Sequence, residues 1–246
     1  MNQTFEEYVK HYNKKDPDIK YKYNHSYRVM EKTKLLTKDL KKEDQMLAEG
    51  IGLYHDIGRF EQDKLYNTFD DSKVFDHADY GVKILFEDNL IKQIPVSEKY
   101  YKIINKAIKN HNKYEIEKGL TGKELLHAKL IRDADKLDIL YSASEKLMTK
   151  KAIDLEGKTF SVRDSINKEF YNKKQIKTSA ILGSKTNSEK IVSFIALVFD
   201  LNFKESAKFL LDNQILENLY NNITNKEAYK EYFAFAINYL KEMIKC

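Results

Sequence analysis

Helical spacing of apolar residues, almost uninterrupted by proline, limits most what this chain can fold into. Only Pro17 and Pro95 occur among 246 residues, with 8 glycines, so long helices can run with few forced breaks. A chain of this length fits one domain, or one domain with a small helical appendage, and needs no metal merely to hold its fold. The sequence therefore predicts a nearly all-α protein.

The charged residues favour a solvated helical surface over a nucleic-acid interface. The chain has 43 Lys and Arg against 38 Asp and Glu, a net charge of +5, and the lysines are mixed with acidic residues along most of its length. A nucleic-acid groove would need basic residues clustered on one face. We therefore expect no nucleic-acid partner.

The single cysteine and the hydropathy pattern indicate a cytoplasmic protein. Cys246 cannot form an intrachain disulfide, which suits a reducing compartment. Met1 to Lys10 has no apolar signal core, and no apolar run approaches the ~20 residues that a membrane span requires. No membrane partner is expected.

Two helices are predicted before residue 60. The spacing of Val29, Thr33, Leu36 and Leu40 marks the buried face of the first, and His25 lies on that face. The second begins near Glu43 and carries His55-Asp56 in its last turn, until Gly58 lets the chain leave the helix. Residues 59–76 are polar, aromatic and unperiodic, so we expect a long loop there, of the kind that often carries function.

Further helices are expected around two more histidines. Asp76 is placed to cap the N-terminus of a helix on which His77 and Gly81 share a face. Another helix contains His111 and is predicted to end near Gly119.

The pattern of polar and apolar residues changes in the C-terminal part of the chain. A longer helix is predicted from Leu125 to Leu147, and Ile191 to Leu201 is an 11-residue apolar segment, suited to a buried helix and too short for a membrane span. We expect a domain over residues 1–150 and a helical extension over residues 151–246 that packs on it. This extension could also form the face of a homodimer.

Histidine and aspartate residues at the predicted core-facing positions carry the chemistry. In chain order they are His25, His55, Asp56, His77, His111 and Asp135. Imidazole and carboxylate together suit Fe, Mn, Co or Zn, and the lack of thiolates argues against a structural zinc site. The first three with Asp135 could hold one ion, and Asp56 could bridge to a second ion held by His77 and His111.

The aspartate ligand of the longer helix has two candidates, Asp133 and Asp135. Two residues apart on a helix, they point about 200° apart and cannot both face one metal. Isoleucine and leucine residues flank both at helical spacing, so the periodicity does not decide between them.

Three segments contain an H…HD…D pattern within residues 20–145. They are His25-Ser26-x-Arg28-Val29, Leu53-Tyr54-His55-Asp56-Ile57-Gly58 and Asp133-Ala134-Asp135-Lys136-Leu137-Asp138. Through them the chain resembles the HD superfamily of metal-dependent phosphohydrolases. The resemblance implies an all-α HD-domain bundle of five or more helices in which these residues bind a divalent metal. It favours Asp135, because the family's aspartate precedes a basic residue and a leucine.

Two further segments, His77-x-x-x-Gly81 and Ala107-Ile108-x-x-His111, resemble the additional histidines of the binuclear branch of this superfamily. The resemblance thus implies one or two divalent ions, drawn from Fe, Mn, Co, Zn and Mg. No Gly-Tyr-Pro follows His111, which disfavours the cyclic dinucleotide phosphodiesterases. The residues after Asp56 lack the acidic pair of the guanosine tetraphosphate hydrolases.

The resemblance implies a phosphohydrolase that cleaves a small phosphoester, such as a nucleotide, with metal-activated water. Asp56, Arg59 and Lys136 are the expected catalytic residues, and Arg59 and Lys136 are placed to hold phosphate oxygens. The expected partner is a small phosphorylated substrate.

Two other classes of function stay open. HD-type di-iron oxygenases use the same four histidines and two aspartates, and oxygen consumption would identify them. A catalytically silent nucleotide-binding module would bind a nucleotide tightly without turnover.

Overall fold

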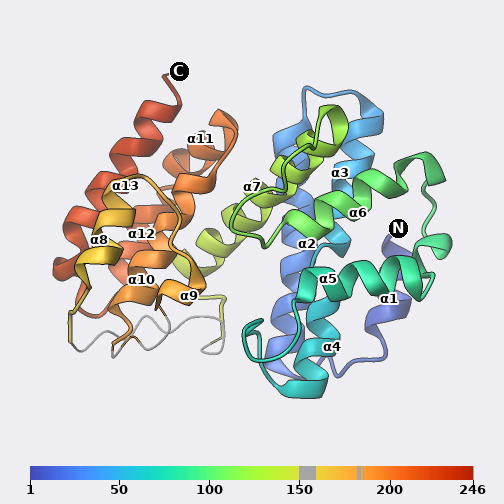
Figure 1. Ribbon diagram of the computed structural model, residues 1–246, viewed down its shortest axis with the longest axis horizontal. Helices are drawn as coiled ribbons and strands as arrows, with labels where there is room; N and C mark the ends of the chain where they lie inside the picture. The colour runs from blue at the N-terminus through green and yellow to red at the C-terminus, as the bar shows by residue number, and fades with distance from the viewer. Residues whose placement is uncertain (150–158, 182–183, 185, 246) are drawn as a thin grey trace. The chain divides into compact units, whose positions relative to one another are not determined.

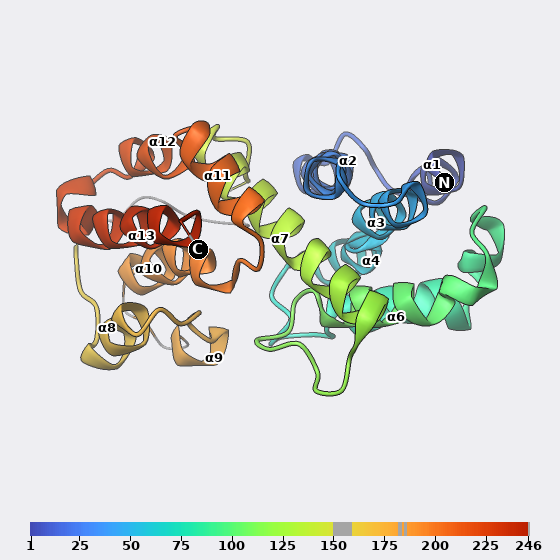
Figure 2. The same cartoon turned by 90° about the horizontal axis from the view of Figure 1, so that it is seen from above.

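The computed structural model describes residues 1–149, 159–181, 184 and 186–245. Over these residues the chain forms helices and no strand (Figures 1 and 2), which confirms the predicted all-α fold. No helix in this part of the chain has both the length and the apolar composition that crossing a membrane requires.

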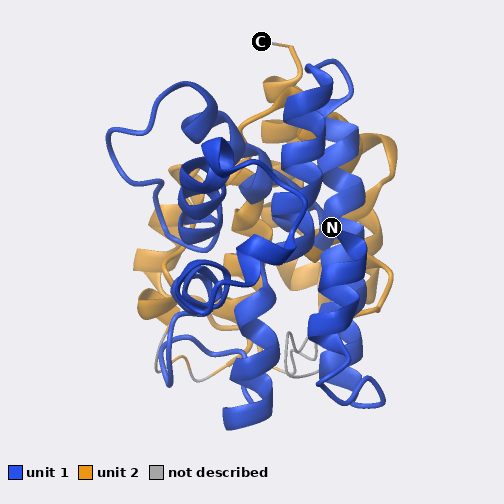
Figure 3. Cartoon of the chain, turned by 90° about the vertical axis from the view of Figure 1, so that its right-hand side faces the viewer, with its two compact units in different colours: residues 1–138 blue, residues 139–246 orange. Residues whose placement is uncertain are grey.

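The chain divides into two compact units, Met1–Asp138 and Ile139–Cys246 (Figure 3). The first contains α1 (Asn2–Val9), α2 (Pro17–Thr37), α3 (Lys42–Tyr54), α4 (Ile57–Tyr66), α5 (His77–Val82), α6 (Tyr101–Asn110) and most of α7 (Gly122–Ser144). The second contains α8 (Asp164–Tyr171), α9 (Thr178–Ile181), α10 (Ser188–Ile195), α11 (Lys204–Asp212), α12 (Ile215–Asn222) and α13 (Lys230–Met243). The predicted packing of residues 151–246 on the first domain stays a prediction.

Short 3₁₀ and π elements connect these helices. They are η1 (Lys83–Glu87, a π-helix), η2 (Leu90–Gln93), η3 (Glu98–Tyr100), η4 (Ala196–Asp200) and η5 (Lys226–Tyr229).

The α2–α3 pair forms the frame of the first unit. The side chain of Asp16 caps α2 by accepting hydrogen bonds from the first-turn amides, and Pro17 follows at a position where no amide donor is needed. The two helices run side by side. A Cβ atom on Gly52 of α3 would lie only 3.0 Å from the Cα of Met30 in α2, so glycine allows this close approach.

His55 and Asp56 lie at the junction of two helices, not in the last turn of one. His55 is the C-terminal cap of α3, and Asp56, with φ −103° and ψ 17°, precedes α4. The prediction that Gly58 ends the helix is also wrong, because Gly58 lies in the first turn of α4. A Cβ atom there would lie 2.2 Å from the carbonyl oxygen of His77, so the glycine serves close packing of α4 on α5.

The predicted loop over residues 59–76 is wrong in its first half. Helix α4 continues to Tyr66, and only residues 67–76 lack a helix. The apolar period was absent because the buried side of α4 is partly polar: Gln62 is fully buried. Its amide donates to Oδ1 of Asp71 and to the carbonyl of Phe75, both at 2.9 Å.

The predicted cap at Asp76 is confirmed. Its carboxylate accepts hydrogen bonds from the amides of Ala78 and Asp79 at 2.9 and 3.1 Å. This cap starts α5 at His77 and so fixes the position of the His77 backbone, from which the imidazole extends.

The predicted helix end near Gly119 is wrong, because α6 ends at Asn110. The buried guanidinium of Arg132 donates to the carbonyls of Asn110 and Tyr114 at 2.8 and 3.3 Å. Carbonyls that a longer helix would use are therefore bonded to α7.

The apolar segment Ile191–Leu201 is buried, as predicted, but it is not one continuous α-helix. Helix α10 ends at Ile195, and η4 continues the segment as a tighter helix. The long helix predicted from Leu125 to Leu147 is α7, three residues earlier at each end.

Candidate metal centre

The six predicted ligands meet in one cluster inside the first unit. His25 comes from α2, His55 and Asp56 from the α3–α4 junction, His77 from the start of α5, His111 from the end of α6, and Asp135 from α7. All are nearly inaccessible except the Asp135 side chain, of which 13% is exposed. The predicted core-facing orientation of His25 is confirmed.

The two carboxylate oxygens of Asp56 face different pairs of imidazoles. Oδ2 lies 3.4 and 3.6 Å from the Nε2 atoms of His25 and His55. Oδ1 lies 3.1 and 3.5 Å from the Nε2 atoms of His77 and His111. This is the arrangement that a carboxylate bridging two cations requires.

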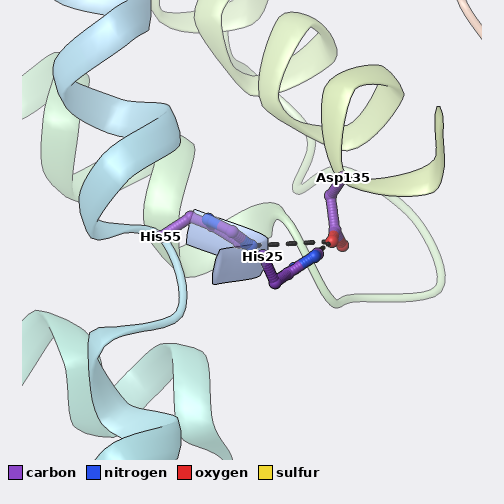
Figure 4. A group of neighbouring side chains, drawn as sticks. All are labelled: His25, His55 and Asp135. Atoms are coloured by element: carbon purple, nitrogen blue, oxygen red, sulfur yellow. Dashed lines mark ion pairs between the residues drawn. The ribbon is translucent and has the colours of Figure 1, made fainter. Parts of the chain in front are cut away.

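Asp135 completes the first of these two groups. Its Oδ1 lies 3.1 Å from Nε2 of His25 and 3.5 Å from Nε2 of His55, and Figure 4 shows all three side chains pointing toward one another. The distances thus place Asp135 at the imidazoles and leave Asp133 on another side of α7. The ligand atoms of His25, His55 and Asp135 lie within 4.8 Å of one another, as do those of His55, Asp56 and His111.

Backbone carbonyls orient two of the imidazoles. Nδ1 of His55 is 2.8 Å from the carbonyl oxygen of Gly52, and Nδ1 of His111 is 2.7 Å from that of Ile108. Both histidines follow the last residue of a helix, where the carbonyl three residues earlier can accept from a side chain; the Ile108 carbonyl also accepts from the backbone amide of His111 at 3.3 Å. With the hydrogen on Nδ1, each Nε2 presents its lone pair to the cluster.

Carboxylates orient the other two imidazoles. Nδ1 of His25 is 2.7 Å from Oδ2 of Asp138, and Nδ1 of His77 is 2.8 Å from Oδ2 of Asp71. Asp138 is held in turn by Nε of Arg28 at 2.8 Å. Such outer partners fix the ring and raise its basicity as a ligand.

These partners were not among the residues predicted from the sequence. The sequence could have indicated Asp138, since it lies three residues after Asp135 and therefore on a neighbouring part of the same helix face. Lys22 lies three residues before His25 and could have been indicated in the same way; its Nζ lies 2.7 Å from Oδ2 of Asp56. Asp71 lies in a loop without periodicity, so nothing local marked it.

The surrounding charges leave the carboxylates ionised. Burial alone would raise the pKa of Asp56, but Lys22 and the neighbouring imidazoles outweigh it and hold this pKa well below its usual range. Burial and Lys22 lower the pKa of His25, but Asp135, Asp138 and Asp56 outweigh them and raise it to about 10. His25 must therefore release a proton before it can ligate a cation.

His111 behaves differently from His25. Burial is the largest influence on it, and its pKa falls to about 4 despite the nearby carboxylate of Asp56. The imidazole is therefore neutral at pH 7, which is the state that ligates a metal.

The residues present fit one or two divalent ions. Within the described part of the chain, Nε2 of His25 and Nε2 of His55 are buried without a partner in hydrogen-bond geometry. Buried polar atoms without a partner are rare, and a bound ion is one explanation. A donor set of imidazole nitrogens and carboxylate oxygens suits the transition metals named above.

Of the two predicted substrate-binding cations, Arg59 lies beside a predicted ligand and Lys136 follows one in the sequence. Nη1 of Arg59 donates to Gln62, to the carbonyl of Phe69 at 2.7 Å and to Oδ1 of Asp71 at 2.8 Å, and its Nε lies 3.9 Å from Oδ1 of Asp56. Lys136 follows Asp135 in α7 and is 5% exposed. Their roles in binding substrate stay predictions.

Comparison with known families identifies the part of the chain that builds this cluster. Residues 23–140 match the family model described as the HD domain. No curated protein and no solved structure matches the chain significantly. The matched range contains all six predicted ligands together with Asp71 and Asp138, and all but its last two residues lie within the first compact unit.

Proposed function

Because this chain is an HD-domain protein, and HD domains bind divalent metals in a superfamily of metal-dependent hydrolases, we propose that it cleaves a small phosphoester such as a nucleotide. The observation that carries the proposal is the position of Asp56. Each of its carboxylate oxygens lies within 3.6 Å of two imidazole nitrogens.

The side chains divide into two ligand groups. His25, His55, Asp135 and Oδ2 of Asp56 would hold one cation, and His77, His111 and Oδ1 of Asp56 would hold the other. Cations bound there would lower the pKa of a coordinated water and stabilise negative charge on the phosphoryl oxygens.

The protein supplies orientation and charge around these groups. The Nδ1 partners aim the imidazoles inward, which removes the need to reorder them during the reaction. Lys22 and Arg59, with side chains 11% and 13% exposed, place positive charge beside the cluster, where a phosphoester dianion would be attracted.

Phosphate release from a panel of nucleotides and small phosphoesters tests the proposal. Protein supplied with Mn²⁺ is expected to hydrolyse at least one member, to stop when a chelator is added, and to recover when Mn²⁺ returns. His55→Ala should abolish this release. Its imidazole belongs to both triplets whose ligand atoms lie within 4.8 Å of one another, His25–His55–Asp135 and His55–Asp56–His111. His11→Ala, a change at an exposed histidine, is the matched control and should retain it.

Metal-loaded protein that releases no phosphate from any member would contradict the proposal. Oxygen consumption by that protein would then identify an oxygenase, and tight nucleotide binding without turnover would identify a silent binding module.

A further inference from the structure

Lys22 is the basic side chain in closest contact with the cluster. It lies on α2, three residues before His25, and its ammonium nitrogen is 2.7 Å from Oδ2 of Asp56. This is the same oxygen that faces His25 and His55. Only 11% of the Lys22 side chain is exposed, so the charge is held in place rather than free in solvent.

Aromatic rings cover the ammonium group. The Lys22 nitrogen lies 5.6 Å from the ring centroid of Tyr21 and 5.3 Å from that of Phe69. These rings favour the cation electrostatically. Among the described residues, Asp56 is the one hydrogen-bond acceptor of Lys22, so two of the three ammonium hydrogens can point to another anion.

Arg59, the other cation beside Asp56, already donates hydrogen bonds to several other groups. One of its terminal nitrogens already donates to Gln62, Phe69 and Asp71. The bonds to Phe69 and Asp71 join α4 to the loop of residues 67–76. The guanidinium therefore holds the loop, and binding a substrate with that nitrogen would require breaking at least one of these bonds.

We propose that Lys22 binds a phosphoryl oxygen of the substrate, an inference that rests on the proposed phosphohydrolase function. A cation at His25, His55 and Asp135 would take Oδ2 of Asp56 as a ligand and neutralise the charge that now holds Lys22. The ammonium then remains beside the ligand group, fixed by Tyr21 and Phe69, and its hydrogens donate to a phosphate dianion. Lys22 is thus a substrate-contacting residue whose anionic partner changes from Asp56 to the phosphoryl group.

Binding of inorganic phosphate to the Mn²⁺-loaded full chain tests this inference by calorimetry. Lys22→Met is expected to weaken phosphate binding about 10- to 100-fold, the loss of a hydrogen bond to a charged group. Its Mn²⁺ content should equal that of the unchanged protein, because Lys22 is not a ligand. Lys22→Arg, which keeps the charge, should restore part of the affinity.

Two further variants complete the design. Lys20→Met removes an exposed lysine from the same helix and should leave phosphate binding unchanged. Lys22→Gln keeps a donor toward Asp56, so it tests the inference if Lys22→Met fails to fold, and it should also weaken phosphate binding about 10-fold or more. With the best substrate found in the panel, Lys22→Met and Lys22→Gln should raise KM more than they lower kcat.

The outcomes separate this inference from the proposed function. Unchanged phosphate affinity in Lys22→Met, with phosphate still binding to the Mn²⁺-loaded protein, overturns the role of Lys22 and leaves the phosphohydrolase intact. Loss of Mn²⁺ from Lys22→Met also overturns it, because Lys22 would then serve the metal site. If the unchanged Mn²⁺-loaded protein binds no phosphate, the role of Lys22 fails, and the proposed function is decided separately by phosphate release from the panel.

Discussion

Asp56→Asn is expected to lower phosphate release at least about 1,000-fold, the rate equivalent of the several kcal/mol that metal ions supply to such a reaction. Asparagine keeps the shape but loses the charge and one of the two oxygens, so it cannot bridge the two imidazole pairs. Metal content should fall as well, because each pair loses its shared carboxylate. Phosphate release and elemental analysis of metal content measure the two effects.

The same substitution should also destabilise the fold modestly. Lys22 would lose the carboxylate 2.7 Å away while remaining mostly buried, at a cost of about 1–3 kcal/mol in the free energy of unfolding. Asp39→Asn removes an exposed carboxylate and serves as the control, with activity and metal content unchanged. Full metal content in Asp56→Asn would contradict the assignment of Asp56 as a ligand.

Gly58→Ala is expected to lower the free energy of unfolding by about 3 kcal/mol or more. The added Cβ would lie 2.2 Å from the carbonyl oxygen of His77 and 2.9 Å from the amide nitrogen of Gly81. Both contacts are with backbone, so α4 and α5 would have to separate. Urea unfolding measures the loss, and a drop in metal affinity should accompany it, because His77 starts α5 and would move.

Gly81→Ala provides the matched control on the opposite helix. Its Cβ would lie 3.3 Å from the Cγ2 methyl of Ile57 and 3.5 Å from the amide nitrogen of Gly58, far less close than the contacts at Gly58, and alanine favours a helix more than glycine does. We expect the free energy of unfolding to change by less than about 1 kcal/mol. If Gly58→Ala is as stable as Gly81→Ala, the close contact of α4 with α5 does not hold.

The sequence predicted the fold class and the position of the cluster because both depend on helical spacing. The apolar face that continues from His25 identified a buried histidine in α2, which the structure confirms. The ligand choice at Asp133 or Asp135 needed a family resemblance, since apolar residues surround both. The structure places Asp135 beside His25 and His55.

The features that escaped prediction depend on contacts between distant parts of the chain. Residues 59–66 form a helix although their pattern is polar, because Gln62 finds its partners in the following loop. The sequence predicts a helix end at Gly58, whereas the glycine admits the backbone of α5. Asp71 reaches Nδ1 of His77 from a loop, and no local pattern could have indicated that contact.

Metal content of the purified chain, after removal of metal with a chelator and reloading with Mn²⁺, tests the central claim most directly. Our account predicts about two ions per chain, joined by Asp56. In His111→Ala it predicts about one ion, because the group of His25, His55 and Asp135 stays complete. A reloaded chain that holds no stoichiometric metal would contradict the account.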